Sequence, residues 1–327
     1  MIISRTPLRV SLFGGGTDFE KYYKVNGGEV VSFAIDKSIY VAVNKRFDGR
    51  LHLRYSKTEL VPRVAELNHD LIKECLKYME IKSGIELVIS SDVPSVGTGL
   101  GSSGSLTVGT LAALFAYKDV AVSNLELADI ACKIEIEKLG APIGKQDQYA
   151  CAIGGFNHIL FHKDGMIEVV DLCEKYGSLI GKILSALRLF YVPAGRKSAK
   201  VLKVYSRNID KNRTKIDINR SLVSAFLDKL KMHVVRPEDL GILLNKAWKI
   251  KKENSPASTE LIEKAFEVGN NHGLLGGKIC GAGAGGFMLA ISEVASSGGL
   301  IEAMEEAGFK NTEYKLWHTG SEIIYRG

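Results

Sequence analysis

Residues 94–104 read PSVGTGLGSSG, a run in which four glycines and two adjacent serines separate a β-rich segment from a helical one. Glycine lets the backbone turn tightly and brings its N–H groups close to an anion. The helix that follows points the positive end of its dipole, and its unpaired N–H groups, at the same place. A serine N-cap in a flexible loop would explain only part of the pattern. The stretch therefore predicts a phosphate-binding loop, in which the Ser102 and Ser103 hydroxyls are available to phosphate or to a magnesium ion.

Two other nucleotide motifs fit the chain less well. Residues 99–104 and 281–286 both match the glycine spacing of a dinucleotide-binding fingerprint. In that fingerprint the glycines follow directly from a strand and lead into a helix. Here residues 90–96 precede the first match, and a strand-like run follows the second. Residues 140–146 are one residue too short for a Walker A loop and place Gln146 where Ser or Thr must reach the metal. A Rossmann oxidoreductase remains a rival that NAD binding would reveal.

Composition sets broad limits. The chain has 327 residues, of which 46% are hydrophobic and 24% charged, as in ordinary globular proteins. The net charge of +6 is a mild excess that suits a nucleotide but does not indicate nucleic acid. Five cysteines without C-x-x-C spacing suggest neither a disulfide framework nor a zinc site. No signal peptide or membrane-length apolar run is visible, so we expect a cytoplasmic protein without a membrane partner.

The first half of the chain alternates strand and helix patterns. Strands are expected at Ile2–Phe13, Val30–Ile35, Ile39–Asn44 and Ile85–Ile89, helices at Val64–Met79, Ser103–Tyr117 and Asn124–Leu139, and a hairpin at Ile153–Phe161 and Met166–Val170. The second half is expected to begin with a strand at Leu187–Val192.

The second half is different, because 198–272 reads as consecutive helices with Pro237 and Pro256 at helix starts. Further strands are expected at Gly277–Ile279, Gly286–Ile291, Glu313–His318 and Ile323–Tyr325, and a helix at Ser296–Glu306. This change of pattern predicts two domains, 1–182 and 183–327.

Three motifs in order carry a resemblance to a known family. The loop at 94–104 resembles the nucleotide loop of the GHMP kinases, the superfamily of galactokinase, homoserine kinase, mevalonate kinase and phosphomevalonate kinase. Residues 7–18, PLRVSLFGGGTD, resemble its N-terminal motif, and residues 278–287, KICGAGAGGF, resemble its C-terminal glycine-rich motif. The three motifs span nearly the whole chain.

The resemblance implies an α+β fold with an N-terminal domain like the second domain of ribosomal protein S5 and a ferredoxin-like C-terminal domain. It implies ATP and Mg²⁺ as cofactors and a small-molecule acceptor. The residues assigned to the nucleotide are Pro94, Gly97, Gly99, Leu100, Gly101, Ser102, Ser103 and Gly104.

Two acidic residues follow the loop. Glu135 lies four residues after Ala131 and four before Leu139, so it projects from the apolar face of the expected helix. A carboxylate there is costly without a partner, and a metal ion is a suitable one. The alternative is a helix edge exposed to water. Asp147 follows at a distance of twelve residues, in the order and spacing of galactokinase-like members.

The family pattern supplies roles for these residues. It assigns Glu135 and Ser103 to magnesium, and Asp147 to the base or charge-stabilising position. Arg9 occupies the family's basic position and is expected to lower the pKa of Asp147 or to stabilise the transferring phosphoryl group. Phosphoryl transfer needs positioning and charge neutralisation more than a protein nucleophile.

The N-terminal motif bears on the acceptor. Galactokinases carry Gly-Glu-His-Thr-Asp where this chain has glycines at 15 and 16, so two side chains are missing from the sugar pocket. The pattern resembles the branch that contains D-glycero-D-manno-heptose 7-phosphate 1-kinases and fucokinase-like proteins. A sugar phosphate is therefore the expected substrate. The residues assigned to it are Gly15, Gly16, Thr17, Asp18, Gly281, Gly283 and Ala284.

A heptose phosphate needs a second phosphate site. Arg196 and Lys197 follow a strand and a glycine turn at a helix start, an arrangement able to bind an anion. A solvated basic helix start explains them equally well. Rival functions are a fucose or galactose 1-kinase and a non-catalytic nucleotide- or sugar-binding relative. We expect a monomer or a homodimer.

Overall fold

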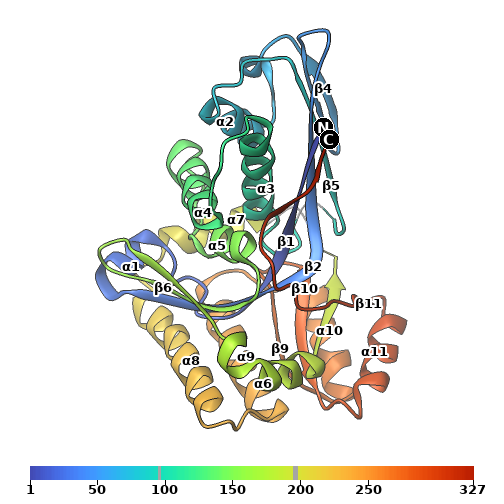
Figure 1. The fold of residues 1–327 in the computed structure, drawn as a ribbon. Coiled ribbons are helices and arrows are strands. Elements are labelled where there is room, and N and C mark those ends of the chain that lie inside the picture. The colour runs from blue at the N-terminus through green and yellow to red at the C-terminus, as the bar shows by residue number, and fades with distance from the viewer. Residues whose placement is uncertain (95–96, 194–197) are drawn as a thin grey trace.

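Two β-sheets organise the chain (Figure 1). The computed structural model describes residues 1–94, 97–193 and 198–327. The larger sheet has the order β12-β1-β2-β5-β3-β4, with β6 and β7 added through β2. The smaller sheet has the order β11-β8-β10-β9 and is antiparallel throughout. The chain therefore has the expected α+β architecture.

The strands are β1 (Ile2–Phe13), β2 (Gly28–Lys45), β3 (Leu51–Arg54), β4 (Thr58–Val61), β5 (Ile85–Ser91), β6 (Phe156–Phe161), β7 (Ile167–Asp171), β8 (Leu187–Val192), β9 (Leu274–Ile279), β10 (Gly286–Ser292), β11 (Lys310–Asn311) and β12 (Glu322–Arg326). The helices are α1 (Glu20–Asn26), α2 (Asp70–Tyr78), α3 (Ser102–Tyr117), α4 (Asn124–Cys132), α5 (Gln146–Ile153), α6 (Cys173–Ala186), α7 (Ser198–Arg207), α8 (Arg213–Lys231), α9 (Pro237–Asn254), α10 (Glu260–Asn271) and α11 (Ser297–Glu306). Two short turns complete them, a 3-10 turn at Val64–Glu66 and a π-helical turn at Lys133–Lys138.

Helix α3 is the centre of the first half. It packs against β1 and β2 as well as α4 and α5, and most of its side chains are buried. Helices α2, α3, α4 and α5 lie together on one side of the long strands (Figure 1). Because α3 begins directly after the glycine loop, packing on all its sides fixes the position of the loop.

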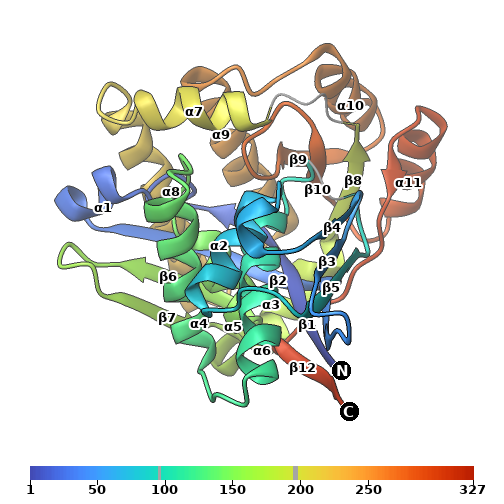
Figure 2. The same ribbon diagram turned by 90° about the horizontal axis from the view of Figure 1, so that it is seen from above.

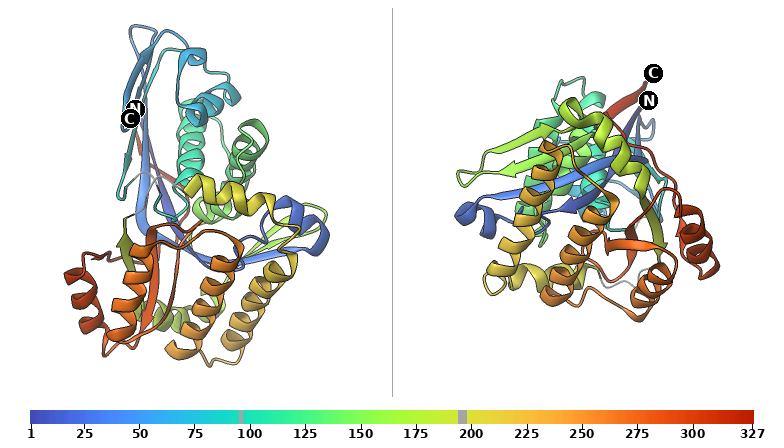
Figure 3. Two further views of the ribbon diagram at one scale, coloured as in Figure 1. Left: turned by 180° about the vertical axis from the view of Figure 1, so that it is seen from behind. Right: turned by 90° about the horizontal axis from the view of Figure 1, so that it is seen from below.

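The second half closes the other end of the molecule. Seen from behind and below, helices α8 to α11 gather with the smaller sheet at the end away from the chain termini (Figure 3). Phe226 of α8 contacts Phe13 of β1 and Phe156 of β6, so the two halves share one hydrophobic core. The last strand, β12, pairs with β1, which brings both termini to the same edge of the larger sheet (Figure 2).

Most expected elements are present, and several differ in form or bounds. Val30–Ile35 and Ile39–Asn44 are parts of one strand, β2. The helix expected over Val64–Met79 is a 3-10 turn followed by α2. Pro256 does not start a helix, because α10 begins at Glu260 with Thr259 as its N-cap. Glu313–His318 is not a strand, and contributes only a single bridge between Leu316 and Ile35.

Within the described residues, no helix is long and apolar enough to cross a membrane. The division after residue 182 stays a prediction.

Candidate active site

A cavity of about 350 Å³ lies between the glycine loop and the second half of the chain. Its walls come from β1, the loop after β1, the start of α3 and the start of α5, together with α7, α8, α9 and the turn between β9 and β10. All three sequence motifs therefore meet at one place.

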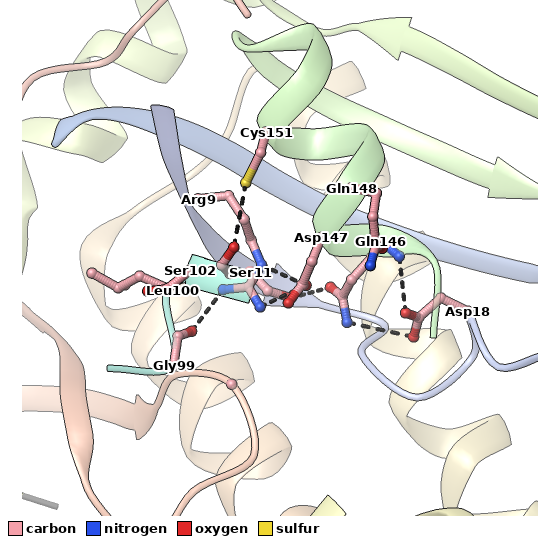
Figure 4. Close-up of polar contacts among 12 residues, drawn as sticks. Arg9, Ser11, Asp18, Gly99, Leu100, Ser102, Gln146, Asp147, Gln148 and Cys151 are labelled. Atoms are coloured by element: carbon pink, nitrogen blue, oxygen red, sulfur yellow. Dashed lines mark hydrogen bonds and ion pairs between the residues drawn. The ribbon is translucent and has the colours of Figure 1, made fainter. Parts of the chain in front are cut away.

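The Arg9 side chain, on β1, forms a buried ion pair with Asp147 at the start of α5 (Figure 4). Its Nε and Nη2 atoms donate to Asp147 Oδ1 at 2.9 and 2.6 Å, and Nη1 donates to the Gly99 carbonyl at 2.6 Å. Burial disfavours the charge on Arg9, but the Asp147 carboxylate more than offsets this, so the pKa of Arg9 is raised. The Arg9 guanidinium thus forms hydrogen bonds both to the glycine loop and to Asp147 on α5.

The carboxylate of Glu135 lies in a set of neutral donors. The Ser103 hydroxyl donates to one of its oxygens, and Thr107 Oγ1 and Gln148 Nε2 donate to the other at 2.9 and 2.8 Å. Glu135 is only 2% exposed, and burial raises its pKa despite these hydrogen bonds. In the described part of the chain, the Gln148 Oε1 atom is buried without a partner. A buried carboxyl group surrounded by neutral donors, beside a serine hydroxyl and the unpartnered Gln148 oxygen, fits a hydrated magnesium ion.

The expected single helix over Asn124–Leu139 changes form where this acid lies. Helix α4 ends at Cys132, and Lys133–Lys138 follow as a π-helical turn. A π turn shifts the side chains relative to a regular helix and often occurs at functional sites. Glu135 is nonetheless buried, as its position on the apolar face predicted.

Asp18 lies farther along the same wall. It accepts from the Gln146 backbone N–H at 3.1 Å and from the Gly16 N–H at 2.9 Å. Gln146 also accepts from the Ser11 hydroxyl at 2.9 Å, so its amide bridges Ser11 and Asp18 (Figure 4). Burial is the main reason that the pKa of Asp18 is raised. A second carboxyl is thus held next to Asp147 with a geometry suited to hydroxyl groups.

Close backbone contact explains two glycines of the loop. A Cβ at Gly99 would lie 2.4 Å from the Cys280 carbonyl oxygen, so the loop packs directly on the C-terminal glycine motif. A Cβ at Gly104 would lie 3.0 Å from Asp147 Cβ, so this glycine lets α3 approach α5. The glycine at 104 therefore sets the position of the acid, beyond any part it has in phosphate binding.

The space above Gly16 is filled from the second half of the chain. With φ at +102°, a Cβ at Gly16 would lie 2.0 Å from the Tyr205 hydroxyl oxygen of α7. Asn219 of α8 donates to the Gly15 carbonyl at 2.7 Å. Tyr205 thus occupies the space that a side chain at residue 16 would need.

Comparisons with known proteins agree with this geometry. The model of the GHMP kinases N terminal domain matches residues 70–155. A D-glycero-alpha-D-manno-heptose 7-phosphate kinase of Campylobacter jejuni is 29% identical over 326 residues, which cover 94% of each chain. The chain thus contains an N-terminal domain of the GHMP kinase type at residues 70–155. It is therefore an enzyme of the phosphotransferase class, and ATP is the phosphoryl donor that this family uses.

Two further relatives show how wide the likeness is. A galactokinase of Thermotoga petrophila is 25% identical over 335 residues, covering 93% of each chain. The crystal structure of a D-glycero-D-manno-heptose 1-phosphate kinase from Bacteroides thetaiotaomicron covers 100% of each chain with a TM-score of 0.75 and 21% identity. At that identity the second likeness concerns the fold.

The structure brings most of the predicted site residues to this cavity. Those that line it are Arg9, Gly15, Gly16, Asp18, Gly97, Gly99, Gly101, Ser102, Ser103, Gly104, Glu135, Asp147, Gly281 and Gly283.

Four predicted residues lie elsewhere. Pro94 is exposed and Leu100 packs in the core. The Thr17 hydroxyl donates to the Glu29 carbonyl at 2.8 Å, and the Ala284 N–H donates to the Ala257 carbonyl, so both hold backbone in place. Arg196 and Lys197 lie outside the described residues. Their assigned roles stay predictions.

Sequence reasoning missed several residues that line the cavity. These are Ser11, Gln146, Gln148, Tyr205, Asn219, Lys251 and Lys278. Gln146 and Gln148 flank Asp147, Lys278 opens the C-terminal motif and Ser11 lies within the N-terminal motif, so proximity to a motif was an available signal for those four. Tyr205, Asn219 and Lys251 come from α7, α8 and α9, whose sequences carry no motif.

Proposed function

We propose that this kinase transfers the γ-phosphoryl group of ATP to the anomeric hydroxyl of D-glycero-D-manno-heptose 7-phosphate. The products are the 1,7-bisphosphate and ADP. The observation that carries the proposal is the Arg9–Asp147 pair in a cavity that also holds the buried carboxylates of Glu135 and Asp18.

Asp147 is suited to take the proton of the attacking hydroxyl. Arg9 occupies only its Oδ1 atom, and within the described residues no protein group donates to Oδ2. The side chain is 30% exposed and lines the cavity, so an acceptor hydroxyl can approach it. As the hydroxyl oxygen bonds to the γ-phosphorus, the bond to the β-phosphate oxygen breaks and the proton passes to Asp147.

The other groups position the reactants and balance charge. Arg9 keeps the carboxylate oriented and lies near the transferring group. The loop amides and the N-terminus of α3 bind phosphate oxygens. Magnesium, held by Glu135 and Ser103, would neutralise phosphate charge when bound. Asp18, with Gln146 beside it, is suited to two sugar hydroxyls.

A relative and the shape of the pocket support this choice of acceptor. The Campylobacter jejuni protein is named as a heptose 7-phosphate kinase. In this chain the Tyr205 hydroxyl stands above Gly16, a sugar pocket built differently from the Glu-His pattern of galactokinases. We retain Arg196 and Lys197 as proposed ligands of the 7-phosphate.

A free-sugar 1-kinase of the fucose or galactose type is the second candidate. The favouring observation is the likeness to a galactokinase over 93% of the chain. Such an enzyme would use the same Asp147 and Asp18 chemistry, but it would need no second phosphate site.

An ADP-release assay across heptose 7-phosphate, fucose, galactose, mannose and mevalonate tests the proposal. We expect the highest kcat/KM for heptose 7-phosphate. A preference for fucose or galactose would replace the substrate and keep the kinase, and no ADP release with any acceptor would refute the proposed reaction.

A further inference from the structure

Three cationic side chains from three elements meet behind the two glycine loops. Arg9 comes from β1, Lys251 from α9 and Lys278 from β9, and all three line the cavity. The charges of all three act on the buried Cys280 thiol, which lies within the C-terminal glycine motif. Because Cys280 also touches Gly99, this cluster lies directly behind the nucleotide loop.

Only one of the three cations has an acidic partner. Arg9 is paired with Asp147, whereas neither lysine has a carboxylate within 4.0 Å in the described ranges. Lys278 Nζ donates to the carbonyls of Ser11 and Leu12 at 2.9 and 2.8 Å. Lys251 Nζ donates to the carbonyls of Ile279 and Gly281. An ammonium group has three N–H donors, so each lysine keeps one beyond those bonds.

Holding two such charges here is unfavourable for the empty protein. Lys278 is 6% exposed, and its burial, together with the nearby charge of Lys251, lowers its pKa to about 7. Burial likewise lowers the pKa of Lys251 to about 8. Apolar residues of similar volume would fill these positions at lower cost. A bound anion would supply the missing counter-charge.

The position of the two lysines indicates which anion they can bind. Gly281 follows the Lys278-Ile-Cys segment and packs against Gly99 of the nucleotide loop. On the other side, Lys278 holds the end of β1, directly before the loop that carries Asp18. The two ammonium groups therefore lie between the predicted nucleotide site and the predicted acceptor site. The anions that the proposed substrates would bring to this place are phosphate groups.

We infer that Lys251 and Lys278 form a cationic subsite that binds a phosphate group of a bound substrate. The phosphate has two sources, the γ-phosphate of ATP or the phosphate of the acceptor sugar. The inference deepens the proposed function and rests on it for the identity of these ligands. The subsite consists of two ammonium groups without acidic partners among the described residues, and it would bind a phosphate from either source in the same way.

The test compares Lys278→Met and Lys251→Met with the wild type and with a matched control. Lys252→Met is the control, because it removes the same charge one residue away from an exposed side chain that pairs with Glu263. Lys278→Gln retains a donor without the charge, and serves if the methionine variant does not fold. Calorimetry measures the Kd of ADP, of the non-hydrolysable analogue AMP-PNP and of heptose 7-phosphate for each folded variant.

A γ-phosphate in the subsite predicts AMP-PNP binding weaker by about ten- to a hundredfold in the Lys251 and Lys278 variants, with the Kd of ADP unchanged. An acceptor phosphate predicts the same loss for heptose 7-phosphate, with both nucleotides unchanged. Lys252→Met should bind all three ligands normally. Folded Lys251 and Lys278 variants with wild-type Kd values for all three ligands would overturn the subsite.

These outcomes separate the subsite from the proposed function. Binding measurements need no turnover, so weaker binding in an enzyme that phosphorylates none of the tested sugars supports the subsite and refutes the reaction. Normal turnover with unchanged binding in the variants refutes the subsite and leaves the reaction intact.

Discussion

The two halves of the chain line the cavity with opposite chemistry. The first half contributes three carboxyl groups, from Asp18, Glu135 and Asp147, and all but Asp147 are nearly fully buried. The second half contributes Lys251 and Lys278, which have only carbonyl oxygens as partners among the described residues. Phosphoryl transfer needs both kinds of group, a proton acceptor with a metal ligand and a place for phosphate charge. The first half therefore supplies the carboxyl groups for proton acceptance and metal binding, and the second half supplies positive charge for phosphate.

The largest expected effect comes from the carboxyl groups that the first half contributes to the cavity. Asp147→Asn keeps the shape of the side chain but removes its ability to accept a proton. We expect kcat to fall at least ~100-fold, because a positioned base commonly contributes that much. ADP release under saturating substrates measures it.

The control for this variant is the Kd of ADP, which should change little because Asp147 forms no hydrogen bond to an amide of the nucleotide loop among the residues that the structure describes. Since Arg9 loses its charged partner, the melting temperature must also be recorded, so that a folding defect is not mistaken for lost chemistry. Turnover near that of the wild type would remove Asp147 from the role of base.

The metal position should give the next largest effect. Glu135→Gln leaves a side chain of the same size without charge, and we expect a tenfold or larger loss of kcat that added Mg²⁺ partly restores. Glu137→Gln, two residues away and exposed, is the matched control and should behave as the wild type. A loss that no magnesium concentration relieves would contradict the assignment of Glu135 to the metal.

How far the sequence predicts this site depends on whether a residue lies within a motif. Glu135 was predicted from its place on an apolar face, and that argument survives the π-helical turn because burial, not helix type, makes the carboxylate costly. Tyr205 and Lys251 could not be predicted, because their partners, Gly16 and Gly281, are distant in sequence and carry no side chain that signals a contact. Pro256 misled for a local reason, since Thr259 is the better N-cap.

A smaller effect concerns the contact between the halves at the acceptor end. Gly16→Ala would place its Cβ 2.0 Å from the Tyr205 hydroxyl oxygen, at a φ of +102°. We expect the KM for the acceptor to rise several-fold. Tyr205→Phe in the same chain removes that oxygen and should recover part of the loss, while the backbone strain at residue 16 persists.

A double-mutant cycle of acceptor KM values checks this contact. Coupling between positions 16 and 205 indicates that Tyr205 contacts residue 16 at the acceptor end of the cavity. Strict additivity of the two substitutions would show that the ring of Tyr205 does not restrict residue 16.

The smallest expected effect concerns Lys278 of the cationic subsite, and it is measured as protein stability. The pKa of Lys278 is about 7 in the folded protein, below its ordinary value of 10.5. Between these values the unfolded chain holds the proton that the folded protein has lost, so stability rises with pH. The stability that neutral Lys278 allows is therefore fully present above about pH 10.5, and it is lost as pH falls toward 7 and the buried amine becomes charged.

Between pH 7.5 and 9.5 the melting temperature of the ligand-free wild type should rise relative to Lys278→Met by about 1–2 °C per pH unit. Lys251, whose pKa is also lowered, remains in both proteins, so the difference between them reports Lys278 together with its interaction with Lys251. Scanning calorimetry without ligands provides the measurement, and a pH-independent difference would mean that Lys278 stays fully charged in the fold. A saturating phosphate-bearing ligand should flatten the difference, because the bound anion keeps Lys278 protonated across this range.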